Sequence, residues 1–302
     1  MSQARAIALV EQFRKGADSG PPAFGKLTTR ADLAADLLAR VRTPELIDQG
    51  FASLCGPAAF MYLIANARPE VYVQYAIDLY TSGKGNIGRL RISPGRDCRS
   101  ALPGSSVIRP VEWITLASLR DSSNSILDYD STDGLSDLTA GVTPPGEMVG
   151  WLRGSGLFSA VASNTSLVFD QGMRTLVDAN NAYGKSMYVA LLVGYTALYN
   201  IAGGTAFPDH WLVLRSSIKV GGKPLPAIWP RTHKRFRQRF PADPQVPLPQ
   251  PVDPDYVEGM NDVAKKSIDF SYYSWGEVRS TATKRVRVED FMDRFYGYVS
   301  LI

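Results

Sequence analysis

The sequence predicts an α+β fold, with a mostly helical first half followed by an antiparallel sheet. Two observations carry this prediction. Apolar residues recur at helical spacing through most of the chain before Ser186, whereas the clear β-branched and aromatic runs lie in the last third. Because helices and strands are segregated and do not alternate, the strands are expected to pair antiparallel, without βαβ crossovers.

The helices are expected where apolar positions repeat along one face and capping residues stand at an end. Thr29 is placed to cap a helix whose apolar residues, from Leu33 to Val41, lie on one face. Thr43-Pro44-Glu45 is typical of a cap followed by proline at the first helical position. Further helices are predicted at residues 5–16, 58–67, 69–79, 111–119, 144–152 and 171–182.

Four runs are expected to form strands, because they are β-branched and aromatic and are bounded by turn residues. They are residues 186–195, 210–216, 268–275 and 296–302. Residues 219–263 contain most of the prolines and are expected to be an insertion, extended where proline excludes helix. Residues 1–25 are expected to be an N-terminal extension, and 26–302 the main domain.

The composition is that of a soluble globular protein, with 302 residues, 45% of them hydrophobic and 21% charged. The net charge of +4 gives no reason to expect a nucleic-acid partner. Two cysteines are too few for a disulfide framework, which indicates synthesis in a reducing compartment. The sequence shows neither a signal peptide nor an apolar run long enough to span a membrane. We therefore expect synthesis in the cytoplasm and, for action outside the cell, export without a cleaved signal.

Cys55 is the candidate nucleophile. It stands at a Cys-Gly-Pro turn into an apolar helix, where unpaired N–H groups and the positive end of the helix dipole favour a thiolate. Pro57 is tolerated there because a first-turn N–H has no helical partner. The side-chain amide of Gln49 and the backbone N–H of Cys55 are placed to stabilise an oxyanion formed at the sulfur.

The base that such a thiol needs is His210, which opens an apolar run predicted to be a core strand. The other histidine, His233, lies among positive charges, which lower a histidine pKa. The other cysteine, Cys98, follows a polar loop and is expected to be a bystander. A simpler interpretation makes Cys55 a buried apolar residue and His210 a hydrogen-bonded strand residue. The glutamine and the Cys-Gly-Pro turn favour a cysteine hydrolase.

Two other motifs are better explained by local structure. Residues 83–88 match the dinucleotide-binding pattern G-x-G-x-x-G but follow a helix and not a strand, so a flexible helix exit is expected. Residues 128–137 are rich in aspartate but lack the alternation and closing glutamate of a calcium loop, so a surface loop is expected. We therefore expect no cofactor and no metal.

Residues 231–240 form a basic run with Phe236 and Phe240 between the charges. Such a run would suit an acidic partner or a nucleic acid. We favour a solvated insertion whose phenylalanines dock on the domain, and we expect no nucleic-acid partner.

Four short motifs, in their order along the chain, resemble those of the papain-like cysteine peptidases: Gln-Gly at 49–50, Cys-Gly at 55–56, His210, and Ser-Trp-Gly at 274–276. The Cys-Gly-Pro-Ala-Ala-Phe stretch is most similar to the bacterial branch typified by bacteriocin-processing peptidases, which cut after double glycine. The resemblance implies a papain-like α+β fold, with a helical half carrying the cysteine and an antiparallel sheet carrying the histidine. It also implies that Cys55 is the nucleophile, His210 the general base and acid, and Gln49 the oxyanion donor.

In that family an asparagine or aspartate commonly orients the histidine, and papain-like sequences read Asn-Ser-Trp-Gly. This chain reads Tyr-Ser-Trp-Gly, so that Tyr273 stands at the asparagine position. The orienting group is therefore Ser274, Asp269, Tyr273 or a backbone carbonyl, or the site is a dyad. Trp275 is expected either to shield the histidine's hydrogen bond or to pack in the core.

The expected reaction is thiolate attack on an amide carbonyl of a protein or peptide, followed by hydrolysis of the acyl-enzyme. A peptidoglycan amidase with the same chemistry is one alternative, and a non-catalytic binding module using the basic patch 231–239 is another. The chain is also similar to interbacterial toxins delivered by contact-dependent secretion machines. That similarity implies export by a specialised secretion system into a target cell, and a cognate immunity protein.

Overall fold

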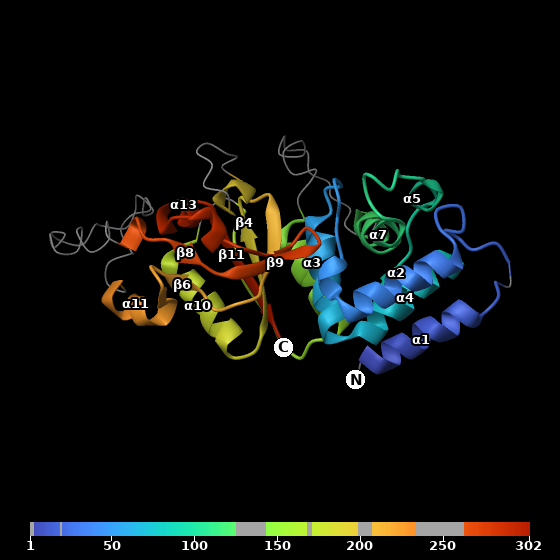
Figure 1. The fold of residues 1–302 in the computed structure, drawn as a ribbon, viewed down its shortest axis with the longest axis horizontal. Coiled ribbons are helices and arrows are strands. Elements are labelled where there is room, and N and C mark those ends of the chain that lie inside the picture. The colour runs from blue at the N-terminus through green and yellow to red at the C-terminus, as the bar shows by residue number, and fades with distance from the viewer. Residues whose placement is uncertain (1–2, 19, 125–142, 168–170, 199–206, 233–262) are drawn as a thin grey trace. The chain divides into compact units, whose positions relative to one another are not determined.

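The computed structural model describes residues 3–18, 20–124, 143–167, 171–198, 207–232 and 263–302. The chain divides into two compact units (Figure 1). The first comprises Met1–Val161 and Tyr273–Val278, and the second comprises Ala162–Tyr272 and Arg279–Ile302. The first unit includes the N-terminal extension predicted at residues 1–25, and the predicted insertion at 219–263 falls within the second.

The first unit is mainly helical. Its four main helices are α1 (Gln3–Lys15), α2 (Arg30–Arg42), α3 (Cys55–Ala67) and α4 (Pro69–Ser82). α1, α2 and α4 contact one another, and α3 packs on α4. α1 buries Ala6, Val10 and Phe13, and the Phe13 ring meets Tyr80 of α4 edge to face at 5.7 Å. α1 therefore contributes to the core of this unit.

Two of these helices follow directly from their sequences. Thr29 caps α2, because its side-chain oxygen accepts a hydrogen bond from the Asp32 backbone N–H at 3.1 Å, as predicted. α3 is apolar almost all round and is buried from Cys55 to Ala65. A helix without a polar face gains most from burial on every side, so α3 lies inside the unit.

Shorter elements complete the first unit: η1 (Pro44–Leu46), β1 (Gly85–Ile87), β2 (Leu90–Ile92), α5 (Arg96–Ser100), α6 (Pro110–Glu112), η2 (Trp113–Ala117), α7 (Ser118–Asn124) and α9 (Pro145–Ser155). The helix predicted at 111–119 is thus α6 continued by η2, a π-helical segment, and α7. Residues 83–88 are more than a helix exit. Gly83 ends α4 in the left-handed conformation, and β1 and β2 then form an antiparallel hairpin. Strands of three residues are too short for their alternation to be recognised from sequence.

The second unit is built on a six-stranded sheet of order β10-β9-β5-β4-β11-β3. Its strands are β3 (Val161–Thr165), β4 (Tyr188–Val193), β5 (His210–Leu214), β9 (Ser271–Ser274), β10 (Glu277–Ser280) and β11 (Phe295–Leu301). β4 pairs antiparallel with both β5 and β11. β5 is buried along its whole length, which explains its unbroken apolar sequence. The tip of the β9–β10 hairpin, Tyr273–Val278, belongs to the first unit.

A second sheet of order β7-β6-β8 lies in the same unit, formed by β6 (Lys219–Val220), β7 (Lys223–Pro224) and β8 (Ile268–Asp269). The helices are α10 (Met173–Gly184), η3 (Tyr195–Leu198), α11 (Leu225–Thr232), η5 (Ala282–Lys284) and α13 (Val288–Met292). α10 packs on β4 and β11.

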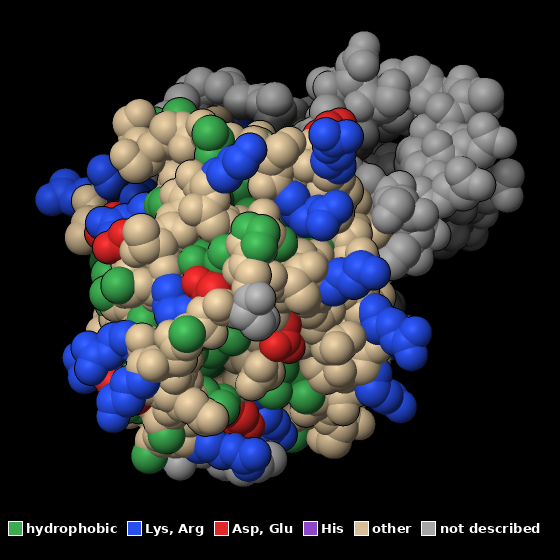
Figure 2. Space-filling model, turned by 90° about the vertical axis from the view of Figure 1, so that its right-hand side faces the viewer, with side chains coloured by type: hydrophobic (Ala, Val, Ile, Leu, Met, Phe, Trp, Pro, Cys, Tyr) green, Lys and Arg blue, Asp and Glu red, His purple; other side chains and the backbone are tan. Residues whose placement is uncertain are grey.

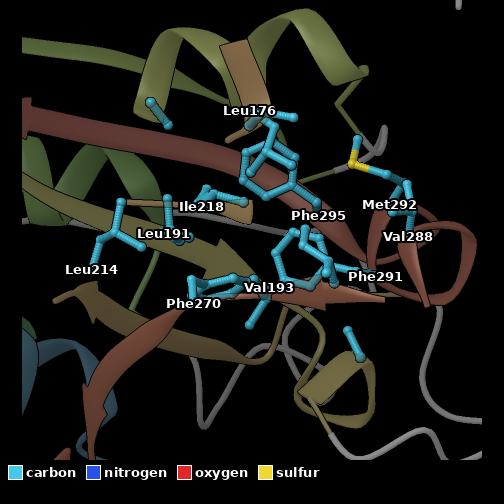
Figure 3. Close-up of a cluster of buried hydrophobic side chains, with 14 of the residues drawn as sticks. Leu176, Leu191, Val193, Leu214, Ile218, Phe270, Val288, Phe291, Met292 and Phe295 are labelled. Carbon is cyan, nitrogen blue, oxygen red and sulfur yellow. The ribbon is translucent and has the colours of Figure 1, made fainter. Parts of the chain in front are cut away.

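Figure 3 shows the core of the second unit, to which α10, the sheets and α13 contribute side chains. Phe291 is central to it, with its ring 5.4 Å from that of Phe270 and 5.7 Å from that of Phe295. Leu176 and Val193 are buried in the same cluster. Burial of these large apolar side chains supplies most of the favourable free energy of folding of this unit.

The predicted α+β class, with an antiparallel sheet in the later part of the chain, is confirmed. The single strand predicted at 268–275 is wrong, because this segment forms β8 and β9 in two different sheets. The break is at Phe270. The Thr281 hydroxyl accepts from the Phe270 N–H at 3.0 Å and the Thr281 N–H donates to the Phe270 carbonyl at 3.1 Å. The confinement of strands to the part of the chain after Ser186 is also wrong, because β1, β2 and β3 precede that residue.

Some predictions lie outside the described residues: the loop at 128–137, His233, and nearly all of the basic run 231–240. On the face of the first unit in Figure 2, lysine and arginine side chains are spread around the surface with acidic side chains among them.

No helix in the described ranges has both the length and the apolar composition needed to cross a bilayer.

Candidate functional site

Cys55 is the first residue of α3 and is 4% exposed. The N-cap residue of this helix is Leu54, whose side chain makes no capping hydrogen bond. The start of a helix carries N–H groups that have no partner within the helix, together with the positive end of the dipole. Both favour the anionic form of a thiol placed there. The prediction that Cys55 lies at the start of a helix is confirmed.

Gly56 allows Thr143 to pack against the first turn of α3. A Cβ atom at Gly56 would lie 2.1 Å from the Thr143 hydroxyl oxygen. Real Cβ contacts are never this short, so only glycine fits beside the buried Thr143. Gly56 thus allows close packing of Thr143 beside the residue that follows Cys55.

Gln49 is buried in a loop with a defined conformation. Gly50 has φ +58, and a Cβ there would lie 2.1 Å from the Val107 carbonyl oxygen, so glycine is required on both counts. The Asp48 carboxylate accepts from the Gly50 N–H at 3.0 Å, and the Phe51 N–H donates to Val107 at 2.9 Å. The glutamine therefore sits on a loop that its neighbours hold in place.

Tyr273 also contacts this loop, and it lies in the same unit. Its hydroxyl donates a hydrogen bond to the Ile47 carbonyl, and its ring stacks on Tyr62 of α3 with ring centroids 3.6 Å apart. Tyr273 is thus bonded to the segment that leads to Gln49.

Ser274 is the last residue of β9 and is buried. Trp275 and Gly276 follow with φ +48 and +73, the pair of positive angles of a type I′ hairpin turn. A positive φ is unusual for tryptophan, so the turn places the half-buried Trp275 side chain at some conformational cost.

His210 is the first residue of β5 in the second unit, where it pairs with Val193 and is 3% exposed. Burial, together with the positive charge of Arg279, lowers the pKa of its imidazole to about 3. The ring is therefore neutral at neutral pH. Tyr195 meets it edge to face at 6.0 Å.

Asp209, next to His210, has a structural role: its carboxylate accepts a hydrogen bond from the Tyr195 N–H at 2.5 Å, at the start of η3. Asp269 lies on β8, and its carboxylate accepts from the Ser267 hydroxyl at 3.1 Å. β8 belongs to the three-stranded sheet and β5 to the six-stranded one.

The structure brings Cys55, Gln49 and Ser274 into the first unit, and it places His210 in the second. The approach of the His210 imidazole to the Cys55 sulfur stays a prediction. Cys98 lies in α5, where burial raises the pKa of its thiol to about 11, with Asp121 adding to the increase. A thiol with this pKa is protonated at neutral pH and is a poor nucleophile.

Sequence reasoning missed Arg279 and Tyr195, the groups whose effect on His210 the structure reveals. Their separation from His210 along the chain leaves no local signal. Among the described residues, no group of three or more His, Cys, Asp or Glu side chains is placed to hold a metal ion. No family model, curated protein or solved structure matches the chain.

Proposed function

We propose that this chain is a cysteine hydrolase of papain-like arrangement that cleaves a peptide or amide bond, with Cys55 as nucleophile and His210 as base. The position of Cys55 as the first residue of α3 carries the proposal, because the start of a helix favours a thiolate. Gln49 supports it as a buried side chain six residues before the sulfur, on a loop that glycine and hydrogen bonds hold.

The reaction follows from these groups. The Cys55 thiol gives its proton to the His210 imidazole, and the sulfur forms a bond to the carbonyl carbon. The Gln49 amide and the Cys55 backbone N–H donate to the oxyanion. When the C–N bond breaks, the amine leaves with the proton from His210, and a thioester remains. Water then gives a proton to His210 and attacks the thioester, which releases the carboxylic acid and returns the proton to the sulfur.

Proton transfer from Cys55 to His210 depends on their contact. The pKa of about 3 keeps the His210 ring neutral at neutral pH but makes the imidazole a weak base by itself. A thiolate formed beside the ring would raise this pKa, because an opposite charge favours the protonated form. Transfer of the proton would therefore be favoured only while sulfur and imidazole are in contact.

The first test is alkylation with iodoacetamide over a range of pH, followed by mass-spectrometric mapping. Cys55 is expected to react well below pH 8.5, the region where an ordinary thiol ionises. Cys98 serves as the comparison within the same molecule, because it is also buried but its thiol pKa is about 11. Equally slow labelling of both cysteines would contradict the proposal.

The second test is hydrolysis by the Cys55→Ala variant, assayed on a fluorogenic peptide library and on peptidoglycan fragments. The substitution is expected to reduce the turnover number at least a thousand-fold, as loss of a catalytic nucleophile does. Ser217→Ala, an exposed substitution in the second unit, is the matched control and should retain activity. Turnover of the cell-wall fragments alone would identify an amidase, and full activity of Cys55→Ala would refute a cysteine hydrolase.

A further inference from the structure

A cavity of about 430 Å³ opens in the first unit beside the residues that lead into α3. Its lining comes from the loop Ala52–Leu54, from α5, and from η2 and α7. α5 and α7 contact each other, as Figure 1 shows. Because Leu54 precedes Cys55 directly, the wall of this cavity is continuous in sequence with the proposed nucleophile.

Most of the lining is apolar. Leu54, Ala101 and Ala117 contribute aliphatic surface, and Trp113 contributes its indole. The indole N–H donates to the Cys98 carbonyl at 3.0 Å, which fixes the ring in one orientation. Trp113 and Ala117 are the two ends of the π-helical segment η2, a local widening of the helix that often occurs at functional sites.

The charges at the cavity are unbalanced towards negative. Asp97 and Asp121 both line it, and neither takes part in an ion pair among the described residues. The one cationic side chain in the lining, Arg120, is paired with Glu147, its Nη1 lying 2.5 Å from a carboxylate oxygen. Asp121 also accepts from the Gly95 N–H at 2.6 Å, which holds its carboxylate in place.

The basic residues of α5, Arg96 and Arg99, line a separate cavity, together with Lys26 and the loop before it. They are not part of the lining shared by Trp113 and the two aspartates. The charge of Arg99 does act on Cys98 in that lining, but the effect of burial and of Asp121 on the Cys98 pKa is larger and of opposite sign.

We infer that this cavity binds an arginine or lysine side chain of a peptide substrate. The aliphatic walls fit the methylene stem of such a side chain, the Trp113 indole offers a cation–π contact, and Asp97 and Asp121 supply opposite charge. The volume is within the range of pockets that hold small ligands. The choice of a peptide as the source of the cation rests on the proposed function, which gives Cys55 a peptide bond to cleave.

Binding is tested on the full chain carrying Cys55→Ala, so that no hydrolysis occurs. The probes are N-acetyl-arginine amide, N-acetyl-norleucine amide and N-acetyl-glutamate amide, followed by NMR of the Trp113 indole N–H, which a Trp113→Phe spectrum assigns. The arginine amide is expected to shift this signal saturably. The double substitution Asp97→Asn, Asp121→Asn should weaken that binding about ten-fold, because charge-assisted contacts are lost while the asparagine at 121 still accepts from Gly95. Asp178→Asn, an exposed change on α10, is the matched control and should bind as before.

An unshifted Trp113 signal, or equal responses to the three amides, would overturn the proposal that this cavity binds a cationic side chain. Thermal unfolding of each variant separates loss of the pocket from loss of the fold. The two proposals fail separately. A Trp113 response to arginine without alkylation of Cys55 at low pH keeps the pocket and removes the hydrolase. Reactive Cys55 with cleavage that is indifferent to arginine and lysine keeps the hydrolase and removes the pocket.

Discussion

The Tyr273 hydroxyl donates a hydrogen bond to the Ile47 carbonyl, which joins residues 226 positions apart in the chain. Ile47 lies two residues before Gln49, and the face of the Tyr273 ring stacks on Tyr62 of α3, the helix that begins at Cys55. One tyrosine therefore contacts both the loop of the proposed oxyanion donor and the helix of the proposed nucleophile.

Replacement of Tyr273 by phenylalanine should lower the free energy of unfolding by about 1–2 kcal/mol, because a buried carbonyl loses its donor while the stacked ring remains. Urea denaturation measures this change. Tyr62→Phe is the matched control: its hydroxyl makes a longer, 3.3 Å contact with Glu45, so a smaller loss is expected. Equal losses for the two variants would show that the bond to Ile47 contributes no more to the free energy of unfolding than the Tyr62 contact does.

Gly56→Ala should destabilise the chain by about 1–3 kcal/mol, because the new methyl group would overlap the Thr143 side chain. The double variant with Thr143→Ala is expected to recover most of this loss, a non-additivity that a double-mutant cycle measures. Gly150→Ala in α9 meets no atom within 4 Å and should be neutral or slightly stabilising. If Thr143→Ala does not reduce the destabilisation caused by Gly56→Ala, the overlap with Thr143 is not its cause.

The buried ion pair of Arg40 and Glu112 predicts a third result. Arg40 donates to both Glu112 carboxylate oxygens, and burial raises the pKa of Glu112 to about 7 against the attraction of Arg40. Arg40→Met alone should cost about 3–5 kcal/mol, because it leaves a buried acid without its partner. Adding Glu112→Leu should restore most of that loss.

Arg14→Ala is the control for this pair, since it removes an exposed i,i+3 contact with Glu11 and should change stability by at most about 0.5 kcal/mol. All three variants are compared by urea denaturation. If the double variant is as unstable as Arg40→Met, the ion pair contributes more favourable free energy than the cost of burying its two charges.

His210 predicts how stability depends on pH. Its pKa is lowered to about 3 in the fold, against about 6.5 in the unfolded chain. Between these values the unfolded state binds the extra proton, so His210 lowers the free energy of unfolding as pH decreases below about 6.5, by up to about 1.4 kcal/mol per pH unit. Glu112, whose pKa is raised to about 7 in the fold, acts in the opposite direction, so the contribution of His210 is the difference between the slopes with and without the histidine. Denaturation from pH 7 to pH 4 measures the slope. His210→Gln should reduce this slope, and an unchanged slope would show that other groups cause it.

The local parts of this structure could be predicted because neighbouring residues decide them. Thr29 caps α2 through a contact three residues away, and the Cys-Gly-Pro turn begins α3 at Cys55 because helix starts depend on a few consecutive residues. The buried run from His210 to Leu214 formed the expected strand. The sequence alone thus determined the helical and strand-forming segments and the placement of the thiol at a helix start.

Contacts between distant residues decided the rest. Thr281 ends the pairing of β8 at Phe270, Arg40 meets Glu112 across 72 positions, and Tyr273 meets Ile47 across 226. The cavity beside Leu54 is likewise assembled from three separated segments. Which side chains meet depends on how elements pack, and packing is chosen by the total burial and hydrogen bonding of the whole unit, which no short stretch of sequence encodes.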